Sequence, residues 1–193
     1  MDYRYIVVIG VSTGGPKALK ALFSDIPKDL DATYVIVQHM PAGFIEPLAR
    51  RLSQYSEITI KEAEDGEILK KGVAYLSPGG VHCRLVNKNA PTIKLSTEKP
   101  YKACRPSANL LFSSLANLDV SKKVISIVLT GMGSDGLEGI NDLKNNIKDV
   151  TVVVENKESS IIYGMPKVIS EANLHDYELH IKEISGLIKK LVR

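Results

Sequence analysis

Apolar, β-branched runs alternate with segments of helical period along this sequence, and this alternation constrains the fold more than any other feature. Runs such as 5–10, 33–38, 124–130 and 150–155 are almost continuously apolar, which is typical of strands buried on both faces. Segments with helical spacing of apolar residues are found at 16–23, 44–55, 107–118, 137–145 and 181–192. This order predicts an α/β fold with a doubly wound, mainly parallel sheet flanked by helices.

The middle of the chain predicts shorter extended pieces. Segments 58–63 and 73–77 are expected to be short strands. Segments 82–86 and 92–96 flank a turn-rich stretch, so we expect them to form an antiparallel hairpin. The 193 residues contain no internal repeat, low-complexity tract or linker, and we therefore expect a single domain over residues 1–193.

Composition excludes several classes of protein. Hydrophobic residues make up 44% and charged residues 24%, the balance of an ordinary globular chain. The net charge is only +3 and no dense basic block is present, so nucleic acid is not an expected partner. No apolar run is long enough for a signal peptide or a membrane span. We therefore expect a cytoplasmic protein without membrane insertion, with Cys83 and Cys104 reduced.

Three polar loops bordered by glycine follow three of the most apolar predicted strands. In a parallel α/β sheet, the loops after the carboxyl ends of the strands gather at one edge, where ligands bind. Loop 10–15 contains Ser12, loop 38–41 contains His39, and loop 130–136 contains Asp135. These are the three residue types of a serine-hydrolase triad.

The segment Gly10-Val11-Ser12-Thr13-Gly14 fits the G-x-S-x-G nucleophile elbow, which joins a strand to a helix. The glycines permit a sharp turn, and the start of the following helix offers backbone N–H groups to an oxyanion. A serine hydroxyl needs a base to take its proton, and a carboxylate must orient that base. His39 and Asp135 are the candidates. Their order along the chain, Ser-His-Asp, differs from the Ser-Asp-His order of lipase-type esterases.

Each of these features has an alternative interpretation. The Ser12 loop is also typical of phosphate-binding turns, His39 can be a hydrogen-bonded structural residue, and Asp135 can cap the helix that follows it. Segment 131–136 also matches G-x-G-x-x-G, with Glu155 placed where a dinucleotide fold has its ribose-binding acid. Too few residues follow this motif for the second half of such a fold. The dinucleotide interpretation also leaves the Ser12 and His39 loops without a role.

Several segments together resemble the catalytic domain of the chemotaxis protein-glutamate methylesterase, the CheB family. They occur in the family's order and cover nearly the whole chain. The matching segments are Ile-Gly-Val-Ser-Thr-Gly-Gly (9–15), Gln-His-Met-Pro-Ala-Gly-Phe (38–44), Lys-Glu-Ala-Glu-Asp-Gly (61–66), Arg-Pro-Ser (105–107), Leu-Thr-Gly-Met-Gly-Ser-Asp-Gly (129–136) and Gly-Met-Pro (164–166).

This resemblance implies an enzyme that removes methyl groups from glutamate methyl esters of methyl-accepting chemotaxis receptors, releasing methanol. The substrate is then the cytoplasmic helical region of the receptors, and some family members also deamidate receptor glutamines. By motif, Ser12 is the nucleophile, His39 the general base and acid, and Asp135 the orienting acid. The backbone N–H groups of Thr13 and Met132 are the expected oxyanion hole. No metal ion or organic cofactor is expected.

Other positions are less informative. Lys102 and Arg105 are candidate substrate-binding residues by position, because cations help to attract a glutamate-rich partner. Arg105 is equally well interpreted as a structural ion-pair partner. Lys157 stands where the family has an acid, and Cys104 and Asn109 stand where it has His and Asp.

The best-known family members carry a receiver domain upstream. We expect this chain to comprise the catalytic domain without a receiver, which leaves its regulator open. A non-catalytic receptor-binding module with the same fold is the alternative from a different class of function. The complete set of Ser12, His39 and Asp135 argues against it, because a binding module needs no triad.

Overall fold

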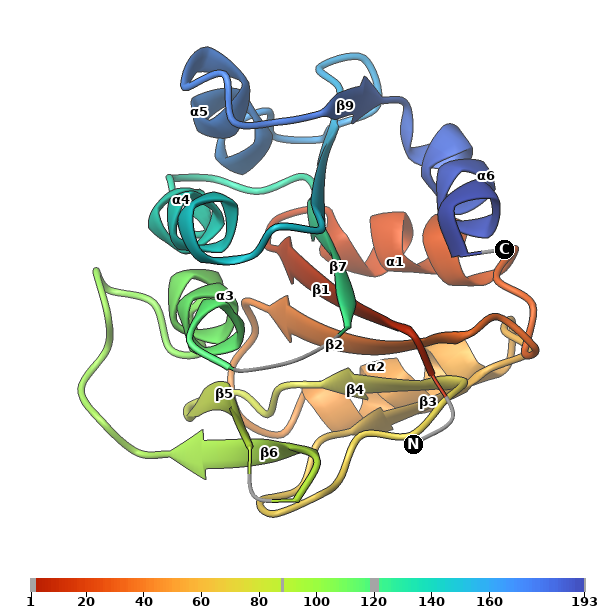
Figure 1. Ribbon diagram of the computed structural model, residues 1–193, viewed down its shortest axis with the longest axis vertical. Helices are drawn as coiled ribbons and strands as arrows, with labels where there is room; N and C mark the ends of the chain where they lie inside the picture. The colour runs from red at the N-terminus through yellow and green to blue at the C-terminus, as the bar shows by residue number, and fades with distance from the viewer. Residues whose placement is uncertain (1–2, 88, 119–121, 193) are drawn as a thin grey trace.

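The computed structural model, which describes residues 3–87, 89–118 and 122–192, places a seven-stranded sheet between two layers of helices (Figure 1). The strands lie in the order β3-β4-β2-β1-β7-β8-β9, and every pairing in the sheet is parallel. The strands are β1 (Tyr5–Val11), β2 (Ala32–Gln38), β3 (Thr59–Glu62), β4 (Val73–Leu76), β7 (Lys123–Val128), β8 (Val150–Glu155) and β9 (Tyr177–Leu179).

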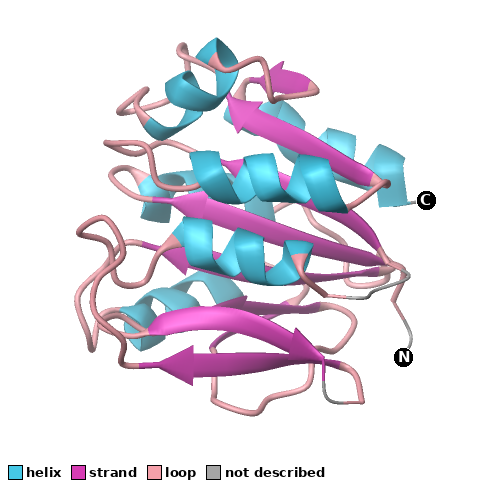
Figure 2. Ribbon diagram, turned by 60° about the vertical axis from the view of Figure 1, so that its left-hand side comes forward, coloured by secondary structure: helices cyan, strands magenta, loops and turns pink. Residues whose placement is uncertain are grey.

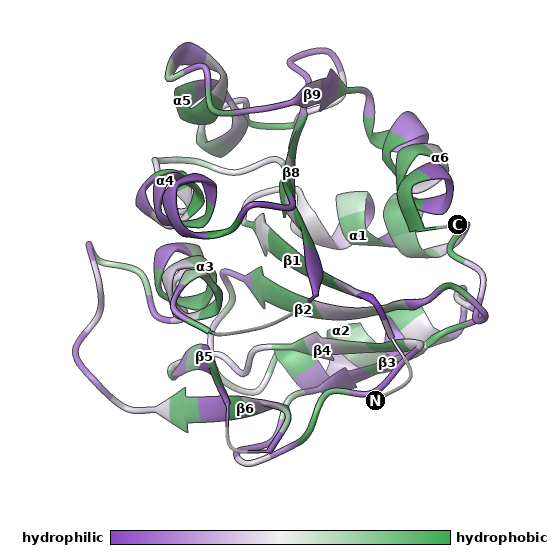
Figure 3. Cartoon of the chain, in the orientation of Figure 1, coloured by the Kyte–Doolittle hydropathy of each residue, from purple (hydrophilic) through white to green (hydrophobic). Residues whose placement is uncertain are grey.

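Helices cover both faces of this sheet. One face packs against α1 (Gly15–Phe23), α2 (Ile45–Ser53) and α6 (Ile181–Val192). The other face packs against α3 (Ala108–Ala116), α4 (Leu137–Asn146) and α5 (Met165–Glu171). Side chains of β1 alternate between the two cores, Val7 and Ile9 facing one and Ile6 and Val8 the other. The hydrophobic colouring along β1 and β2 in Figure 3 reflects this double burial, and the predicted doubly wound fold is confirmed.

The hairpin predicted in the middle of the chain is also present. Strands β5 (His82–Asn87) and β6 (Pro91–Ser96) pair antiparallel and form a separate two-stranded sheet. The hairpin packs on α3, where the Leu85 N–H donates a hydrogen bond of 2.9 Å to the Ser114 hydroxyl. Two elements were not expected from the sequence, the short helix α5 and the three-residue edge strand β9.

The order of the strands reverses direction between β1 and β7. From β1 the chain moves outward through β2 to β4 and β3, whereas from β7 it moves the other way to β8 and β9. The central strands point in the same direction, so their carboxyl ends lie at one edge (Figure 2). Such a switch point opens a crevice at that edge, and the three candidate loops follow β1, β2 and β7 there.

None of the helices in the described ranges has the length and apolar character needed to cross a membrane.

Candidate active site

The register of β1 and β2 brings Ser12 and His39 next to each other. Val11 pairs with Gln38 at the ends of these two strands. Ser12 and His39 are the residues that directly follow this pair, so they lie side by side. The His39 N–H donates to the Val11 carbonyl at 3.0 Å, and the Ser12 N–H donates to the Thr130 carbonyl at 3.0 Å. The three predicted loops therefore meet at the switch point.

His39 and Asp135 are in direct contact although 96 residues separate them. The distance between His39 Nε2 and Asp135 Oδ2 is 2.8 Å. Because a carboxylate can only accept a hydrogen bond, Nε2 carries the proton, and Nδ1 is the nitrogen able to accept one. Within the described part of the chain, the Ser12 hydroxyl makes no hydrogen bond to His39. Contacts of this kind are often long without substrate and tighten when it binds.

Asp135 is held by four donors, and its side chain is buried. Its Oδ1 accepts from the Ser107 hydroxyl at 2.7 Å and the Asn109 N–H at 3.0 Å, and its Oδ2 accepts from the Ala108 N–H at 2.6 Å. Burial alone would raise the pKa of Asp135, but the hydrogen bonds from His39 and from these three groups lower the pKa below its ordinary value. Asp135 is therefore a fixed carboxylate at neutral pH.

The helix that Asp135 caps is not the one that follows it. Its carboxylate binds the first N–H groups of α3, whereas α4 begins beyond Gly136 and is capped by a residue of α3. That residue is Asn109, whose Oδ1 accepts from the N–H groups of Gly136 at 2.9 Å and Gly139 at 3.0 Å. The interpretation of Asp135 as a cap of its own helix was wrong, and the role of Asn109 was missed because it depends on contacts distant in sequence.

Gln38 links the loop of Ser12 to the loop of His39. Its Nε2 donates to the Ser12 carbonyl at 3.0 Å and to the His39 carbonyl at 3.1 Å. No role of its own was predicted for this residue. A signal was present, because a polar side chain that ends a buried strand has to find hydrogen-bond partners.

Two glycines explain why the elbow needs small residues. Gly14 has a φ of +88°, a conformation that side chains disfavour. A Cβ atom on Gly131 would lie 2.7 Å from the Ser12 Cβ and 2.5 Å from the Met165 sulfur. The loop of Ser12 and the loop after β7 can therefore approach each other this closely only with glycine at position 131.

The two predicted oxyanion donors lie on these same loops. Thr13 follows Ser12 directly, and Met132 follows Gly131, which touches Ser12. Within the described ranges, neither backbone N–H donates a hydrogen bond to a protein group. Both N–H groups are thus available to an anionic oxygen, and their assignment as the oxyanion hole stays a prediction.

Lys102 and Arg105 both have partners within the protein. The Lys102 ammonium pairs with the Glu138 carboxylate. Arg105 Nη1 donates to the carbonyls of Glu98 at 3.0 Å and Thr97 at 3.3 Å, so its partners are backbone groups rather than an acid. Both side chains hold the loop before α3, and a contact with substrate stays a prediction.

The groups that a dinucleotide would need are already engaged. The buried Glu155 carboxylate accepts from the Thr130 N–H at 2.8 Å and the Ser159 hydroxyl at 2.9 Å. At the start of α4, the N–H groups of Gly136 and Gly139 bind Asn109. The G-x-G-x-x-G segment therefore serves helix packing and carries the catalytic acid candidate.

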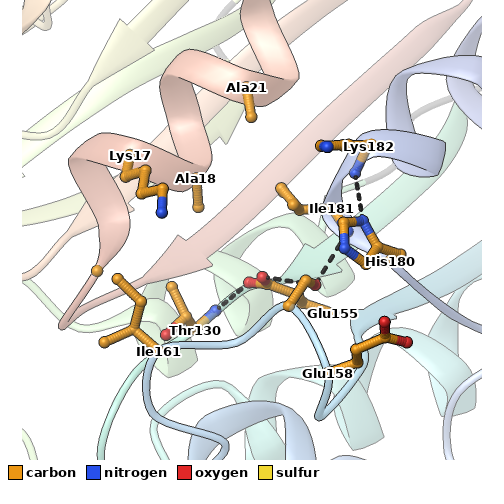
Figure 4. A pocket seen from close by; sticks show the side chains of 12 residues that line it. Lys17, Ala18, Ala21, Thr130, Glu155, Glu158, Ile161, His180, Ile181 and Lys182 are labelled. Atoms are coloured by element: carbon orange, nitrogen blue, oxygen red, sulfur yellow. Dashed lines mark hydrogen bonds between the residues drawn. The ribbon is translucent and has the colours of Figure 1, made fainter.

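A cavity of about 320 Å³ lies beside the candidate triad, between α1 and the start of α6. Figure 4 shows Thr130 and Glu155 at one end of it, with Lys17 and Lys182 on opposite sides. No residue of the candidate triad lines this cavity. The cavity is thus separate from the site at which Ser12, His39 and Asp135 meet.

Comparison with known proteins supports the resemblance seen in the sequence. The family model for CheB methylesterase matches residues 7–188. The protein-glutamate methylesterase/protein-glutamine glutaminase of Halalkalibacterium halodurans is 48% identical over 188 residues, which are 96% of this chain and 53% of that protein. The protein of the same name from Oceanobacillus iheyensis is 47% identical over 188 residues, 97% of this chain and 53% of its own length. The chain thus spans about half the length of these curated relatives.

The crystal structure of the Thermotoga maritima CheB methylesterase catalytic domain has the same fold. Its TM-score is 0.92 at 40% sequence identity, over 97% of this chain and 98% of that one. The match over almost the full length of both chains agrees with the strand order and the two helical layers described above. This chain therefore belongs to the CheB methylesterase family.

Proposed function

We propose that this chain is the catalytic part of a protein-glutamate methylesterase that acts on methyl-accepting chemotaxis receptors and serves chemotactic adaptation. The observation that carries the proposal is the 2.8 Å contact between His39 and Asp135 beside Ser12, in a chain of the CheB family. The names of its relatives add glutamine deamidation as a second activity. The substrate is the cytoplasmic helical region of the receptor, and the enzyme works in the cytoplasm.

The proposed reaction gives each of these three side chains a role. Ser12 Oγ attacks the ester carbonyl carbon while His39 Nδ1 takes its proton, and Asp135 stabilises the imidazolium that forms. The carbonyl oxygen becomes an oxyanion and is bound by the N–H groups of Thr13 and Met132. His39 then protonates the leaving methoxide, so methanol departs and an acyl-enzyme remains.

A water molecule completes the cycle by the same steps. His39 removes a proton from the water, which attacks the acyl-enzyme, and the glutamate carboxylate leaves as Ser12 regains its proton. With a glutamine substrate, ammonia leaves in place of methanol. General acid–base catalysis of this kind contributes about 10² to 10⁴ in rate. This contribution depends on the orientation of the His39 ring, which Asp135 holds by a hydrogen bond. Three further donors keep the Asp135 carboxylate in place.

The test is methanol release from radiolabelled, methylated chemoreceptor membranes. The native chain is expected to release methanol, and the Ser12→Ala variant is expected to lose this activity. Ser24→Ala is the matched control, because Ser24 is exposed and its hydroxyl binds only the Lys20 carbonyl among the described residues. Equal release by the native chain and Ser12→Ala contradicts the triad. Binding to receptors without release by either protein favours the non-catalytic receptor-binding module.

A further inference from the structure

The Cys104 thiol lies within the candidate active site, and the mechanism above does not use it. The Cys104 sulfur, a ring nitrogen of His39 and a carboxylate oxygen of Asp135 all lie within 4.8 Å of one another. Among the described residues, this is the one group of three His, Cys, Asp or Glu side chains close enough to hold a metal ion. His39 Nε2 and Asp135 Oδ2 are already 2.8 Å apart.

The three donor atoms are of the types that zinc prefers. Zinc binds cysteine sulfur at about 2.3 Å, imidazole nitrogen at about 2.0 Å and carboxylate oxygen at about 2.0 to 2.2 Å. In a tetrahedral site these bond lengths separate the donors by about 3.3 to 3.7 Å, so shifts of roughly 1 Å would suffice here. Three protein ligands leave the fourth position to water.

A tight turn holds Cys104 at this position. Tyr101 and Cys104 exchange backbone hydrogen bonds of 3.0 and 2.9 Å, and the two residues between them have left-handed φ angles of 45° and 67°. The turn is anchored to α4, because the Tyr101 hydroxyl donates to the Glu138 carboxylate at 2.7 Å and Lys102 pairs with the same group. The sulfur therefore reaches the triad from an element that carries none of its three members.

We propose that this protein binds a thiophilic divalent metal ion, with Zn²⁺ as the type case, through His39, Cys104 and Asp135, and that the bound ion blocks the hydrolase. The metal replaces the thiol proton, which is released to solvent as the sulfur–metal bond forms. The proton on His39 Nε2 moves to Nδ1, so the imidazole stays neutral and Nε2 binds the ion. His39 then has no nitrogen left to accept the proton of Ser12. The binding step stands by itself, whereas the inhibition rests on the proposed function.

Cobalt is the probe for the binding step, because a cobalt–thiolate bond gives a charge-transfer band in the near ultraviolet. Titrating the metal-free protein with Co²⁺ is expected to produce this band at one ion per chain, and Zn²⁺ is expected to remove it by displacement. In Cys104→Ala the band is expected to be lost. Removing a partner that only supports a metal ligand lowers metal affinity by roughly 10- to 100-fold. Removing a ligand itself is therefore expected to lower the affinity for Zn²⁺ by at least that much.

Cys83→Ala is the matched control, since it removes the other free cysteine, which is buried in a hydrophobic core and is not a member of the three-residue group. This variant is expected to keep the band, and circular dichroism shows whether each variant is folded. A native protein without the band overturns the proposed site. A band that persists in folded Cys104→Ala overturns it as well.

Methanol release tests the inhibition, with each protein compared with its own metal-free sample. Equimolar Zn²⁺ is expected to abolish release by the native chain, a chelator is expected to restore it, and Cys104→Ala is expected to lose the sensitivity. Full activity of the native chain with the site saturated overturns the inhibition. If the metal-free native chain releases no methanol, the proposed function fails, and the cobalt band still decides whether the metal site exists.

Discussion

The side chain of Asp135 combines two tasks that depend on the same charge. Its carboxylate orients His39, and it also binds the Ser107 hydroxyl and the first two N–H groups of α3. An anion at the start of a helix is stabilised by the partial positive charge there. The proposed catalysis and the docking of α3 therefore both depend on an ionised Asp135.

Asp135→Asn is expected to lower kcat by about 10⁴-fold, the loss typical when the orienting carboxylate of a triad becomes an amide. The amide nitrogen can donate a hydrogen bond to His39 and so favour the tautomer that cannot take the Ser12 proton. Methanol release under saturating substrate measures the effect. Glu138→Gln is the control, because Glu138 lies nearby on α4 and binds Tyr101 and Lys102 instead of His39. Equal losses in both variants would contradict the orienting role.

Asp135→Asn should also change how the free energy of unfolding depends on pH in acid. The folded pKa of Asp135 lies below its ordinary value of 3.8, so the unfolded chain binds more protons between the two values. The stabilisation by the carboxylate is complete above pH 3.8 and is lost as the pH falls through the folded pKa. The free energy of unfolding of the native chain should therefore fall more steeply there than that of Asp135→Asn. Urea unfolding at a series of pH values measures both, and parallel curves would contradict the prediction.

Gly131→Ala is expected to reduce activity by about 100-fold, which a misplacement of roughly 1 Å can cause. The added Cβ would lie 2.7 Å from the Ser12 Cβ, so the nucleophile or the loop after β7 has to move. Gly186→Ala in α6 is the matched control, because a Cβ there meets no atom within 4 Å. Methanol release by the two variants is compared after both are shown to be folded, and undiminished release by Gly131→Ala would contradict the close approach.

At the scale of elements, α3 and α4 cap each other. Asp135, just before α4, binds the first N–H groups of α3, while Asn109, in the first turn of α3, binds the N–H groups of Gly136 and Gly139. The helix pair thus sets the position of Asp135, the candidate orienting acid, through hydrogen bonds in both directions. Packing of the two helices and orientation of His39 are coupled for this reason.

Asn109→Ala should lower the free energy of unfolding by about 1 to 2 kcal/mol, as is usual when a capping side chain is lost. Asn109→Asp keeps an acceptor oxygen at the start of α4 and should lose less. Denaturant unfolding compares the two variants with the native chain. A stability of Asn109→Ala equal to that of the native chain would show that water replaces the cap without loss.

The elements differed in how well the sequence predicted them, for physical reasons. Strands β1, β2, β7 and β8 are buried on both faces, so their apolar runs were recognised almost to the residue. Strand β9 has three residues and helix α5 has seven, too few for a periodic pattern to emerge. The triad candidates were found because each follows a recognised strand. The roles of Gln38 and Asn109 depend on partners from other elements, which no local pattern encodes.

For the whole molecule, the carboxyl edge of the sheet combines the reactive groups with exposed apolar side chains. Phe44 is 57% exposed in the loop after β2, and Met132 is 76% exposed in the loop after β7. Ile161 and Ile162 are exposed as well. Both lie next to the site loops, because Ile161 borders Gly14 and the Ile162 carbonyl accepts a hydrogen bond from the Gly131 N–H. Exposed apolar groups at a site are typical of surfaces that bind another protein. These side chains are therefore candidates for contact with the proposed receptor substrate.

Phe44→Ser therefore separates docking from chemistry. If Phe44 contacts the receptor, its loss should lower kcat/KM for methylated receptors by about 10-fold, as expected for an interface residue worth a little over 1 kcal/mol. Hydrolysis of p-nitrophenyl acetate should be unchanged, because this ester is too small to contact Phe44 while it is bound at Ser12. Tyr55→Ser is the matched control, because Tyr55 is an exposed aromatic residue beyond the end of α2, where it contacts Lys20 instead of the active-site loops. Equal losses on both substrates would mean that Phe44 holds the His39 loop in position instead of contacting the receptor. The exposed apolar side chains at this edge would then serve packing rather than receptor binding.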